Sequence, residues 1–283
     1  MESIRTLRIM QETSKRSLHQ GKSIGFVPTM GAIHRGHLSL VKRAKGETDI
    51  VVVSIFVNPI QFGKNEDFDK YPRDLDGDIG KLREEGVDII LMPEAKTMYP
   101  QGFSTSILMG GLSERLCGAY RPGHFTGVAT VVCKLFNIVK PARAYFGQKD
   151  FQQTVIIRRM AEDLNMDLEL VVCPTIREGD GLAMSSRNAY LDTAERKAAA
   201  VIYKSLLSAS EMMKGGAAGP EEAKRHLNEA LKAEPLIAEI QYAGAYDPQT
   251  LEELSAFKKQ NLLALAVKIG STRLIDNVLV EKK

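Results

Sequence analysis

The chain has 283 residues, 44% hydrophobic and 26% charged, which is typical of a globular protein with one large or two medium domains. Its net charge of +3 gives no electrostatic case for a nucleic-acid polymer or a membrane as partner. Three widely spaced cysteines without a CxxC pair suggest neither a disulfide framework nor a cysteine zinc site, and they fit a reducing compartment. The N-terminus lacks the apolar segment of a secretory signal, and no apolar run reaches the about 20 residues of a membrane span. We therefore expect a cytoplasmic protein.

Strand-like and helix-like segments alternate over the first two-thirds of the chain. Apolar, β-branched runs predict buried strands at 23–27, 50–57, 88–92, 143–146 and 168–173. Amphipathic stretches predict helices near 37–46, 74–86, 127–140 and 150–165. This alternation is typical of an α/β fold with a Rossmann-like, doubly wound parallel sheet.

The pattern changes after about residue 185. One long helix is predicted from Thr193 to Lys214, and a second from Pro220 to a point before Pro235. Three β-type runs follow at 236–246, 262–270 and 272–280, the last two joined by a tight turn. We therefore expect two domains, a Rossmann-like one over 1–185 and a small α+β lid domain with an antiparallel sheet over 186–283.

A turn with two histidines follows the first predicted strand, in the run PTMGAIHRGH over 28–37. Imidazoles and free backbone N–H groups at a helix N-terminus stabilise an anion, and His34 and His37 share one helix face. The chain lacks both the GxxxxGK[ST] loop and a GxGxxG after the first strand, so a nucleotide would bind in another way. A zinc pair, which would need a third ligand, and ordinary surface histidines are the alternatives.

Two later segments also carry groups suited to phosphates. Gly147–Asp150 follows a strand and opens a helix, so its lysine would lie at the carboxyl edge of the sheet. Asp150 could accept bonds from ribose hydroxyls or simply cap its helix. Met184–Arg187 offers two hydroxyls and a guanidinium, an anion-binding set that could equally be a polar hinge.

Polar side chains elsewhere have weaker signals. Gln61 and Gln153 stand beside apolar runs, where they could bind a small hydroxy acid or simply face solvent. Asp74, Asp76 and Asp78 lie two residues apart, but the EF-hand pattern is incomplete. They read as a carboxylate cluster at a helix N-terminus or as a water-mediated magnesium contact. Cys133 lies in an apolar run and reads as a buried core thiol.

Taken together, these motifs resemble a known family. The HRGH turn resembles the HxGH signature of the adenylate-forming nucleotidyltransferase superfamily. The chain as a whole resembles the pantoate–β-alanine ligases, or pantothenate synthetases, through five further blocks in family order: FVNPIQF (56–62), YPR (71–73), YRPGHF (120–125), FGQKDFQQ (146–153) and MSSRN (184–188). The tail fits the small C-terminal domain of that family.

The resemblance implies ATP-dependent condensation of (R)-pantoate with β-alanine through a pantoyl adenylate, releasing AMP and pyrophosphate. It implies ATP as substrate with Mg²⁺, a homodimer, and catalytic roles for His34, His37 and Lys149. It assigns His37 the role of proton donor, with which an imidazole pKa near neutrality is compatible. Gln61 and Gln153 would line the pantoate pocket, and Gln61 would also lie near β-alanine. The implied ATP-binding residues are Met30, Gly31, Ala32, Ile33, His34, Arg35, Gly36, His37, Gly147, Gln148, Lys149, Asp150, Ile176, Met184, Ser185, Ser186 and Arg187; no metal ligand is assigned.

One departure and two alternatives accompany this interpretation. The resemblance leads us to expect an acidic residue after His124-Phe125, in what reads as a loop, and this chain has Thr126. The HxGH turn alone would also suit a nucleotidyltransferase that stops after nucleotidyl transfer, which would release a nucleotide conjugate instead of AMP and an amide. A non-catalytic nucleotide-binding or RNA-associated protein would bind ATP without turning over a hydroxy acid.

Overall fold

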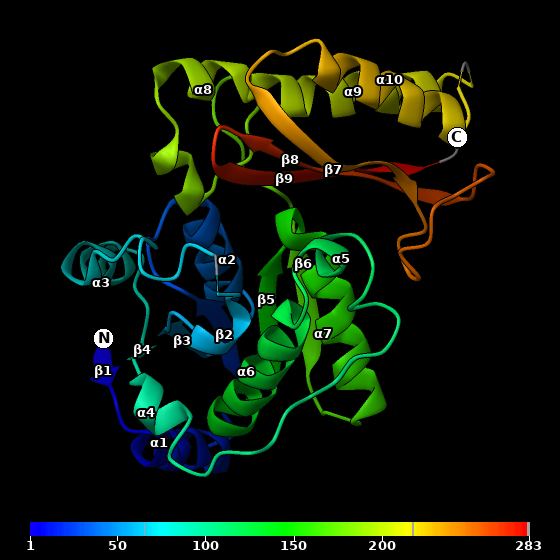
Figure 1. The fold of residues 1–283 in the computed structure, drawn as a ribbon. Helices are drawn as coiled ribbons and strands as arrows, with labels where there is room; N and C mark the ends of the chain where they lie inside the picture. The colour runs from blue at the N-terminus through cyan, green and yellow to red at the C-terminus, as the bar shows by residue number, and fades with distance from the viewer. Residues whose placement is uncertain (65, 217, 282–283) are drawn as a thin grey trace.

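The computed structural model describes residues 1–64, 66–216 and 218–281, which form two sheets with flanking helices (Figure 1). The strands are β1 (Glu2–Ile4), β2 (Ile24–Thr29), β3 (Ile50–Ile55), β4 (Ile89–Leu91), β5 (Arg143–Gly147), β6 (Glu169–Cys173), β7 (Ile237–Tyr246), β8 (Gln260–Ile269) and β9 (Thr272–Glu281). The α-helices are α1 (Leu7–His19), α2 (Arg35–Lys45), α3 (Leu75–Glu84), α4 (Ala95–Met98), α5 (Cys117–Tyr120), α6 (His124–Val139), α7 (Phe151–Asp163), α8 (Thr193–Ala198), α9 (Ala200–Lys214) and α10 (Pro220–Lys232). Short 3₁₀ turns occupy Pro59–Gln61 (η1), Gln148–Asp150 (η2) and Ser186–Tyr190 (η3).

The first sheet is parallel throughout, with strand order β1-β4-β3-β2-β5-β6. From β2 the chain proceeds outward through β3 and β4, and then returns to place β5 on the other side of β2. The strand order therefore reverses between β2 and β5. In open α/β sheets, ligands bind outside the carboxyl ends of the strands at such a switch point.

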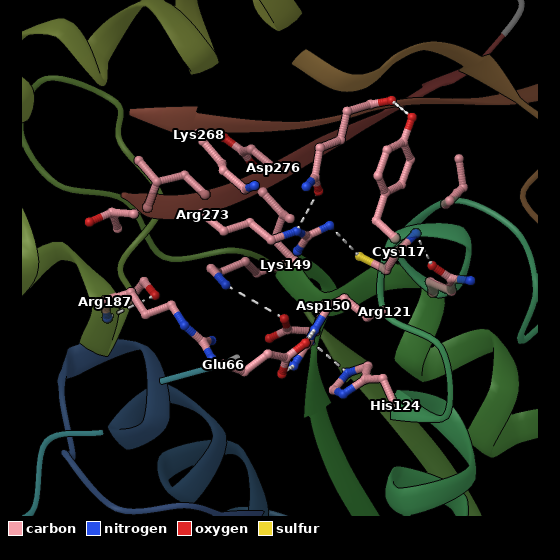
Figure 2. Close-up of a pocket in the computed structure, with 18 of the residues that line it drawn as sticks. Glu66, Cys117, Arg121, His124, Lys149, Asp150, Arg187, Lys268, Arg273 and Asp276 are labelled. Atoms are coloured by element: carbon pink, nitrogen blue, oxygen red, sulfur yellow. Dashed lines mark hydrogen bonds and ion pairs between the residues drawn. The ribbon is translucent and has the colours of Figure 1, made fainter. Parts of the chain in front are cut away.

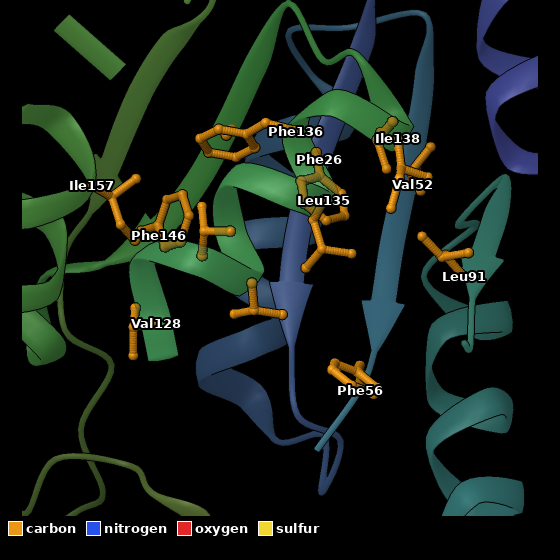
Figure 3. Close-up of a cluster of buried hydrophobic side chains, with 14 of the residues drawn as sticks. Phe26, Val52, Phe56, Leu91, Val128, Leu135, Phe136, Ile138, Phe146 and Ile157 are labelled. Carbon is orange, nitrogen blue, oxygen red and sulfur yellow. The ribbon is translucent and has the colours of Figure 1, made fainter. Parts of the chain in front are cut away.

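Alternate residues of the central strands face two helical layers. Phe26 and Val52 pack into the cluster formed with α1, α6 and α7 (Figure 3). Val27 and Val53 pack with α2 and α3. This follows from the period of two in a strand, and it explains why β2 and β3 read as continuous apolar runs. Each fully buried side chain of this kind contributes about 1.5–3 kcal/mol.

The second sheet is antiparallel, with order β7-β8-β9, and lies across the carboxyl edge of the first (Figure 1). Leu263 and Leu265 of β8 pack with α9 and α10, while Leu262 and Ala264 face the N-terminal part, where Phe151 of α7 joins their cluster. The C-terminal sheet therefore has helices on one face and the N-terminal part on the other.

The expected fold class is confirmed, and the differences are local. The single helix predicted over Thr193–Lys214 is wrong: it is interrupted at Ala199, where Ile202 N–H bonds to Ala199 O, an i→i+3 bond that tightens the turn. The helix expected from 127 already begins at His124, and the strand expected over 50–57 ends at Ile55. No described helix is long and apolar enough to cross a membrane.

Candidate functional site

The switch point between β2 and β5 brings two of the sequence motifs to one edge of the sheet. β2 ends at Thr29 and leads into the histidine turn, while β5 ends at Gly147 and leads into η2. The Met184–Arg187 segment lies close to the histidine turn, because a Cβ placed on Gly36 would lie 3.8 Å from the Cβ of Met184. Segments far apart in the chain therefore meet where an α/β sheet binds its ligand.

The two histidines are held by the helix start itself. His34 is the N-cap of α2, and its Nδ1 accepts a bond from Gly36 N–H at 3.1 Å. His37 Nδ1 accepts from His34 N–H at 3.4 Å, and the two rings stack with centroids 4.0 Å apart. Since both Nδ1 atoms accept, each neutral ring carries its proton on Nε2 and can donate that N–H to a ligand.

The sequence indicates imidazole pKa values near neutrality, but the surroundings of both histidines lower them. Burial, with a further contribution from Lys149, lowers the pKa of His34 to about 4. Burial, with a further contribution from His34, lowers the pKa of His37 to about 3. The rings are uncharged hydrogen-bond donors at neutral pH, because a cation between desolvating walls and a lysine is disfavoured.

The backbone before the histidines is held by α3. Gly31 and Ala32 have left-handed φ values of +83° and +51°, and the buried Asp78 carboxylate accepts bonds from Ala32 N–H at 2.8 Å and Ile33 N–H at 2.7 Å. Lys81, one helical turn further, donates to Ile33 O at 2.9 Å. Burial raises the pKa of Asp78, although both backbone bonds oppose that shift.

These contacts bear on two open interpretations. The N–H groups of Ala32 and Ile33 are occupied by Asp78, so they are not the free anion donors that the turn suggested. Asp74 accepts from Gly77 N–H at 3.0 Å and caps α3. These bonds support the interpretation of Asp74 and Asp78 as carboxylates at a helix N-terminus, and the water-mediated magnesium contact stays a prediction.

A cavity of about 890 Å³ lies between the C-terminal sheet and the carboxyl edge of the first sheet (Figure 2). Five of the implied site residues line it: Lys149, Asp150, Gln153, Ser185 and Arg187. His34, His37 and Gln61 are not among its lining residues. Lys149 Nζ lies 3.5 Å from an Asp150 oxygen. Asp150 makes no side-chain cap bond to α7, which removes the capping interpretation. Desolvation opposes ionisation of Asp150, but Lys149 and Arg187 outweigh it and lower its pKa.

Arg187 is paired with an acidic residue that sequence reasoning missed. Its Nε and Nη2 donate to the two Asp67 carboxylate oxygens, both at 2.9 Å. Desolvation acts against the Asp67 carboxylate, yet the Arg187 bonds lower its pKa overall. Beside this pair, Ser186 Oγ lies 3.0 Å from Tyr71 Oη, and Ser185 Oγ caps η3 by accepting from Arg187 N–H at 3.3 Å.

A second ion pair involves Glu66, the residue before Asp67. Glu66 accepts two bonds from Arg121, at 2.7 and 2.5 Å, and Arg121 Nη1 lies 2.9 Å from His124 Nε2. The other ring nitrogen, Nδ1, lies 2.8 Å from Gln61 O. Burial, followed by the Arg121 charge, lowers the pKa of His124 to about 4. The RPGHF block is thus tied across the cavity wall to the segment that precedes the YPR block.

The two glutamines occupy different surroundings. Gln153 is half-buried and lines the cavity. Gln61 is buried; its Oε1 accepts from Asn58 Nδ2 at 2.9 Å and its Nε2 lies 3.1 Å from Met30 Sδ, so it lies beside the histidine turn. The solvent-facing alternative is therefore excluded for Gln61. Ile176 O accepts from Met184 N–H at 2.9 Å, which joins the strand end after β6 to the Met184–Arg187 segment.

The C-terminal sheet contributes wall residues with no sequence motif of their own. Lys268, Arg273, Asp276 and Asn277 all line the cavity. Arg273 donates to Gln241 Oε1 at 2.7 Å and reaches Cys117 Sγ at 3.1 Å. They are recognised as cavity residues only from their position on β8 and β9, opposite the switch point.

Two smaller expectations change. Thr126 lies in the first turn of α6 rather than in a loop, because α6 begins at His124. Cys133 is half-buried rather than fully buried, although burial still raises its pKa. Neither residue lines the cavity.

Comparisons with known proteins agree with this architecture. A family model described as pantoate-beta-alanine ligase matches residues 2–279. The pantothenate synthetase of Thermodesulfovibrio yellowstonii is 60% identical over 99% of this chain and 100% of its own, and that of Acetivibrio thermocellus is 50% identical over 99% of each. The solved pantothenate synthetase of Thermus thermophilus superposes with a TM-score of 0.93 at 46% identity, covering 98% of this chain and 99% of that one. The pantoate-beta-alanine ligase of Francisella tularensis, solved with beta-gamma ATP and beta-alanine, has a TM-score of 0.81 at 37% identity, covering 99% and 97%. The chain belongs to the pantoate–β-alanine ligase family.

Proposed function

We propose that this chain joins pantoate to β-alanine in two steps, in the cavity between its two sheets. In the first step a pantoate carboxylate oxygen attacks the α-phosphorus of ATP, forming pantoyl adenylate and expelling pyrophosphate. In the second, the free amine of β-alanine attacks the acyl carbon, loses a proton and expels AMP. The observation that carries this proposal is that three segments lie near the switch point of a parallel sheet. They are the histidine turn, Lys149, whose charge acts on His34, and the Met184–Arg187 segment, which approaches Gly36.

The first step brings two anions together, so its barrier is largely electrostatic. Lys149 and Arg187 supply fixed positive charge around the triphosphate. His34 and His37 donate their Nε2–H groups to phosphoryl oxygens as charge builds up in the transition state. Since burial lowers the pKa of His37 to about 3, its role is donation of a hydrogen bond, with protonation following only when the bound triphosphate raises that pKa.

The acceptor side belongs to the two glutamines. Gln153 lines the cavity and Gln61 lies against Met30 beside the histidine turn, and both amides can bind hydroxyl and carboxylate groups such as those of pantoate. Positioning of the carboxylate against the α-phosphorus is then a matter of orientation rather than covalent enzyme chemistry. The cover provided by the C-terminal sheet protects the adenylate from water during the second step.

Magnesium enters with ATP in this proposal. Among the described residues, no group of three or more His, Cys, Asp or Glu side chains converges as in a protein-held metal centre. Asp67 and Asp78 are already engaged by Arg187 and by backbone N–H groups. This fits Mg²⁺ carried on substrate phosphates, which is its usual mode in nucleotide-dependent enzymes.

Three further expectations from the resemblance are part of the proposal. We place the protein in the cytoplasm, which the three free cysteines favour. We expect it to act as a homodimer, and sedimentation at micromolar concentration measures this directly. We keep 1–185 and 186–283 as the two domains, since the hydrophobic cluster around β8, α9 and α10 is separate from the one around β2 and α6.

The deciding experiment separates the two half-reactions. The purified chain with MgATP and pantoate, without β-alanine, should release pyrophosphate only up to the enzyme concentration, and acid quench should recover pantoyl adenylate. Adding β-alanine should then convert the burst into steady turnover with AMP as product. Pyrophosphate release without pantoate, or AMP formation that never passes through a quenchable adenylate, would refute the scheme.

A further inference from the structure

Two adjacent residues of the C-terminal sheet, Asp276 and Asn277, are almost fully buried yet polar, at 2% and 3% exposure. On β9 they pair with Leu265 and Ala264 of β8. Residues paired across a ladder share a face, so Asp276 faces α9 with Leu265, while Asn277 faces the N-terminal part with Ala264. The dipeptide therefore reaches to both sides of its own sheet.

Both the nitrogen and the oxygen of the Asn277 side-chain amide form hydrogen bonds with the segment that carries Lys149. Its Nδ2 donates to Gln148 O and Lys149 O, both at 3.0 Å, and its Oδ1 accepts from Gln148 Nε2 at 3.3 Å. These bonds fix the peptide planes on both sides of Lys149. They connect strand β9 to η2 across about 130 residues of sequence.

Asp276 holds the other phosphate segment. Its two oxygens accept from Arg177 Nη1 and Nη2 at 2.6 and 3.0 Å, and its side chain has no exposed surface. Arg177 in turn donates to Gly181 O at 3.1 Å and stacks 3.6 Å over the Tyr203 ring of α9. This cluster anchors the chain between β6 and Ser185, which leads directly into Arg187.

We propose that Asn277 and Asp276 are positioning residues that set the spacing between Lys149 and the Ser185–Arg187 segment. This inference rests on the proposed function, in which both segments bind the triphosphate. One strand holds both, so a shift of β9 moves them relative to each other. Displacement of a catalytic group by about 1 Å can cost on the order of 100-fold in rate, and Asn277 touches no reacting atom itself.

The test compares Asn277→Ala with Asn228→Ala. Asn228 is a matched control, because its Nδ2 also donates to two backbone carbonyls, Lys224 O at 2.8 Å and Ala243 O at 3.2 Å, but both lie within the C-terminal part. Steady-state pyrophosphate release with pantoate and β-alanine present gives kcat and KM for ATP, and urea denaturation gives stability. We expect Asn277→Ala to lower kcat about 10- to 100-fold with KM for ATP changed less than about threefold, while Asn228→Ala keeps kcat within about twofold.

A second variant identifies the bonds responsible and covers the case in which Asn277→Ala fails to fold. Asn277→Asp keeps the size and the acceptor for Gln148 but replaces both donors with an oxygen facing two carbonyls. We expect its kcat to fall at least as far as that of Asn277→Ala. Full kcat in Asn277→Asp, or equal kcat losses in Asn277→Ala and Asn228→Ala, would overturn the inference. Failure of the wild-type chain to release pyrophosphate would instead refute the proposed function, so the two outcomes are distinguishable.

Discussion

Replacement of Asp78 by asparagine tests how the histidine turn is held. The buried Asp78 carboxylate accepts two backbone bonds, from Ala32 and Ile33, at 2.8 and 2.7 Å. The amide of Asp78→Asn keeps one acceptor and turns an N–H₂ group toward the other backbone N–H. One buried donor is therefore left without a partner.

The magnitude follows from these contacts. Hydrogen bonds to a charged group contribute about 1.5–3 kcal/mol, and an unsatisfied buried donor costs about 1–3 kcal/mol. Burial raises the pKa of Asp78, so its removal also relieves some desolvation cost. We expect Asp78→Asn to lower the free energy of unfolding by about 2–3 kcal/mol. The left-handed backbone at Gly31 and Ala32 would relax, moving His34 and His37 and lowering kcat about 10- to 100-fold.

The assay pairs urea denaturation with pantoate-dependent pyrophosphate release. Asp74→Asn is the matched control, because Asp74 also accepts a backbone bond at the start of α3 but does not reach the histidine turn. Asparagine caps a helix as well as aspartate does, so Asp74→Asn should change neither stability nor kcat. An Asp78→Asn protein with wild-type kcat would show that the turn keeps its geometry without this carboxylate, and the reasoning would fail.

Three further predictions concern charge. Burial lowers the pKa values of His34 and His37 to about 4 and 3, so the unfolded chain binds more protons than the folded one below about pH 6.5. The two rings together should therefore lower the free energy of unfolding by about 3–4 kcal/mol from pH 7 to 5, and an equal slope in a His34→Gln, His37→Gln protein would contradict this. Lys149→Met should lower kcat/KM for ATP by about 100-fold or more, with partial recovery in Lys149→Arg, as measured by pyrophosphate release. Asp67→Asn frees Arg187 for phosphate and should tighten MgATP binding about threefold to tenfold in calorimetry; weaker binding would mean that Asp67 orients Arg187 rather than competing for it.

The parts of the site that the sequence predicts are those formed by neighbouring residues. The histidine turn can be predicted because a buried strand, a glycine and a helix start follow one another directly in the sequence. The Gly147–Asp150 segment has the same order. The alternation of strands and helices then places both at one sheet edge, and the structure confirms that they flank the switch point.

The remaining contacts depend on residues that only the tertiary fold brings together. Arg187 and its partner Asp67 are 120 positions apart, and Lys149 and Asn277 are 128 apart. Sequence pattern identifies Asp78 as an acid in the first turn of a helix, but nothing local says that its oxygens reach Ala32. The histidine pKa values could not be predicted for the same reason. Burial is a property of the packed fold, whereas a sequence offers only the ordinary value of about 6.5.

Lys149 and Arg187, the cations proposed to bind phosphates, are each paired with a carboxylate. Lys149 faces Asp150, Arg187 is held by Asp67, and the two histidines are uncharged. An unpaired cation in a partly dry cavity has a large desolvation free energy, and pairing it with a carboxylate offsets much of that cost. In the proposed function, a bound triphosphate would replace one set of anions with another, and carboxylates such as Asp67 would return to water. Neutral imidazoles suit this exchange, because their N–H groups stabilise a developing phosphoryl charge without requiring a counter-ion beforehand.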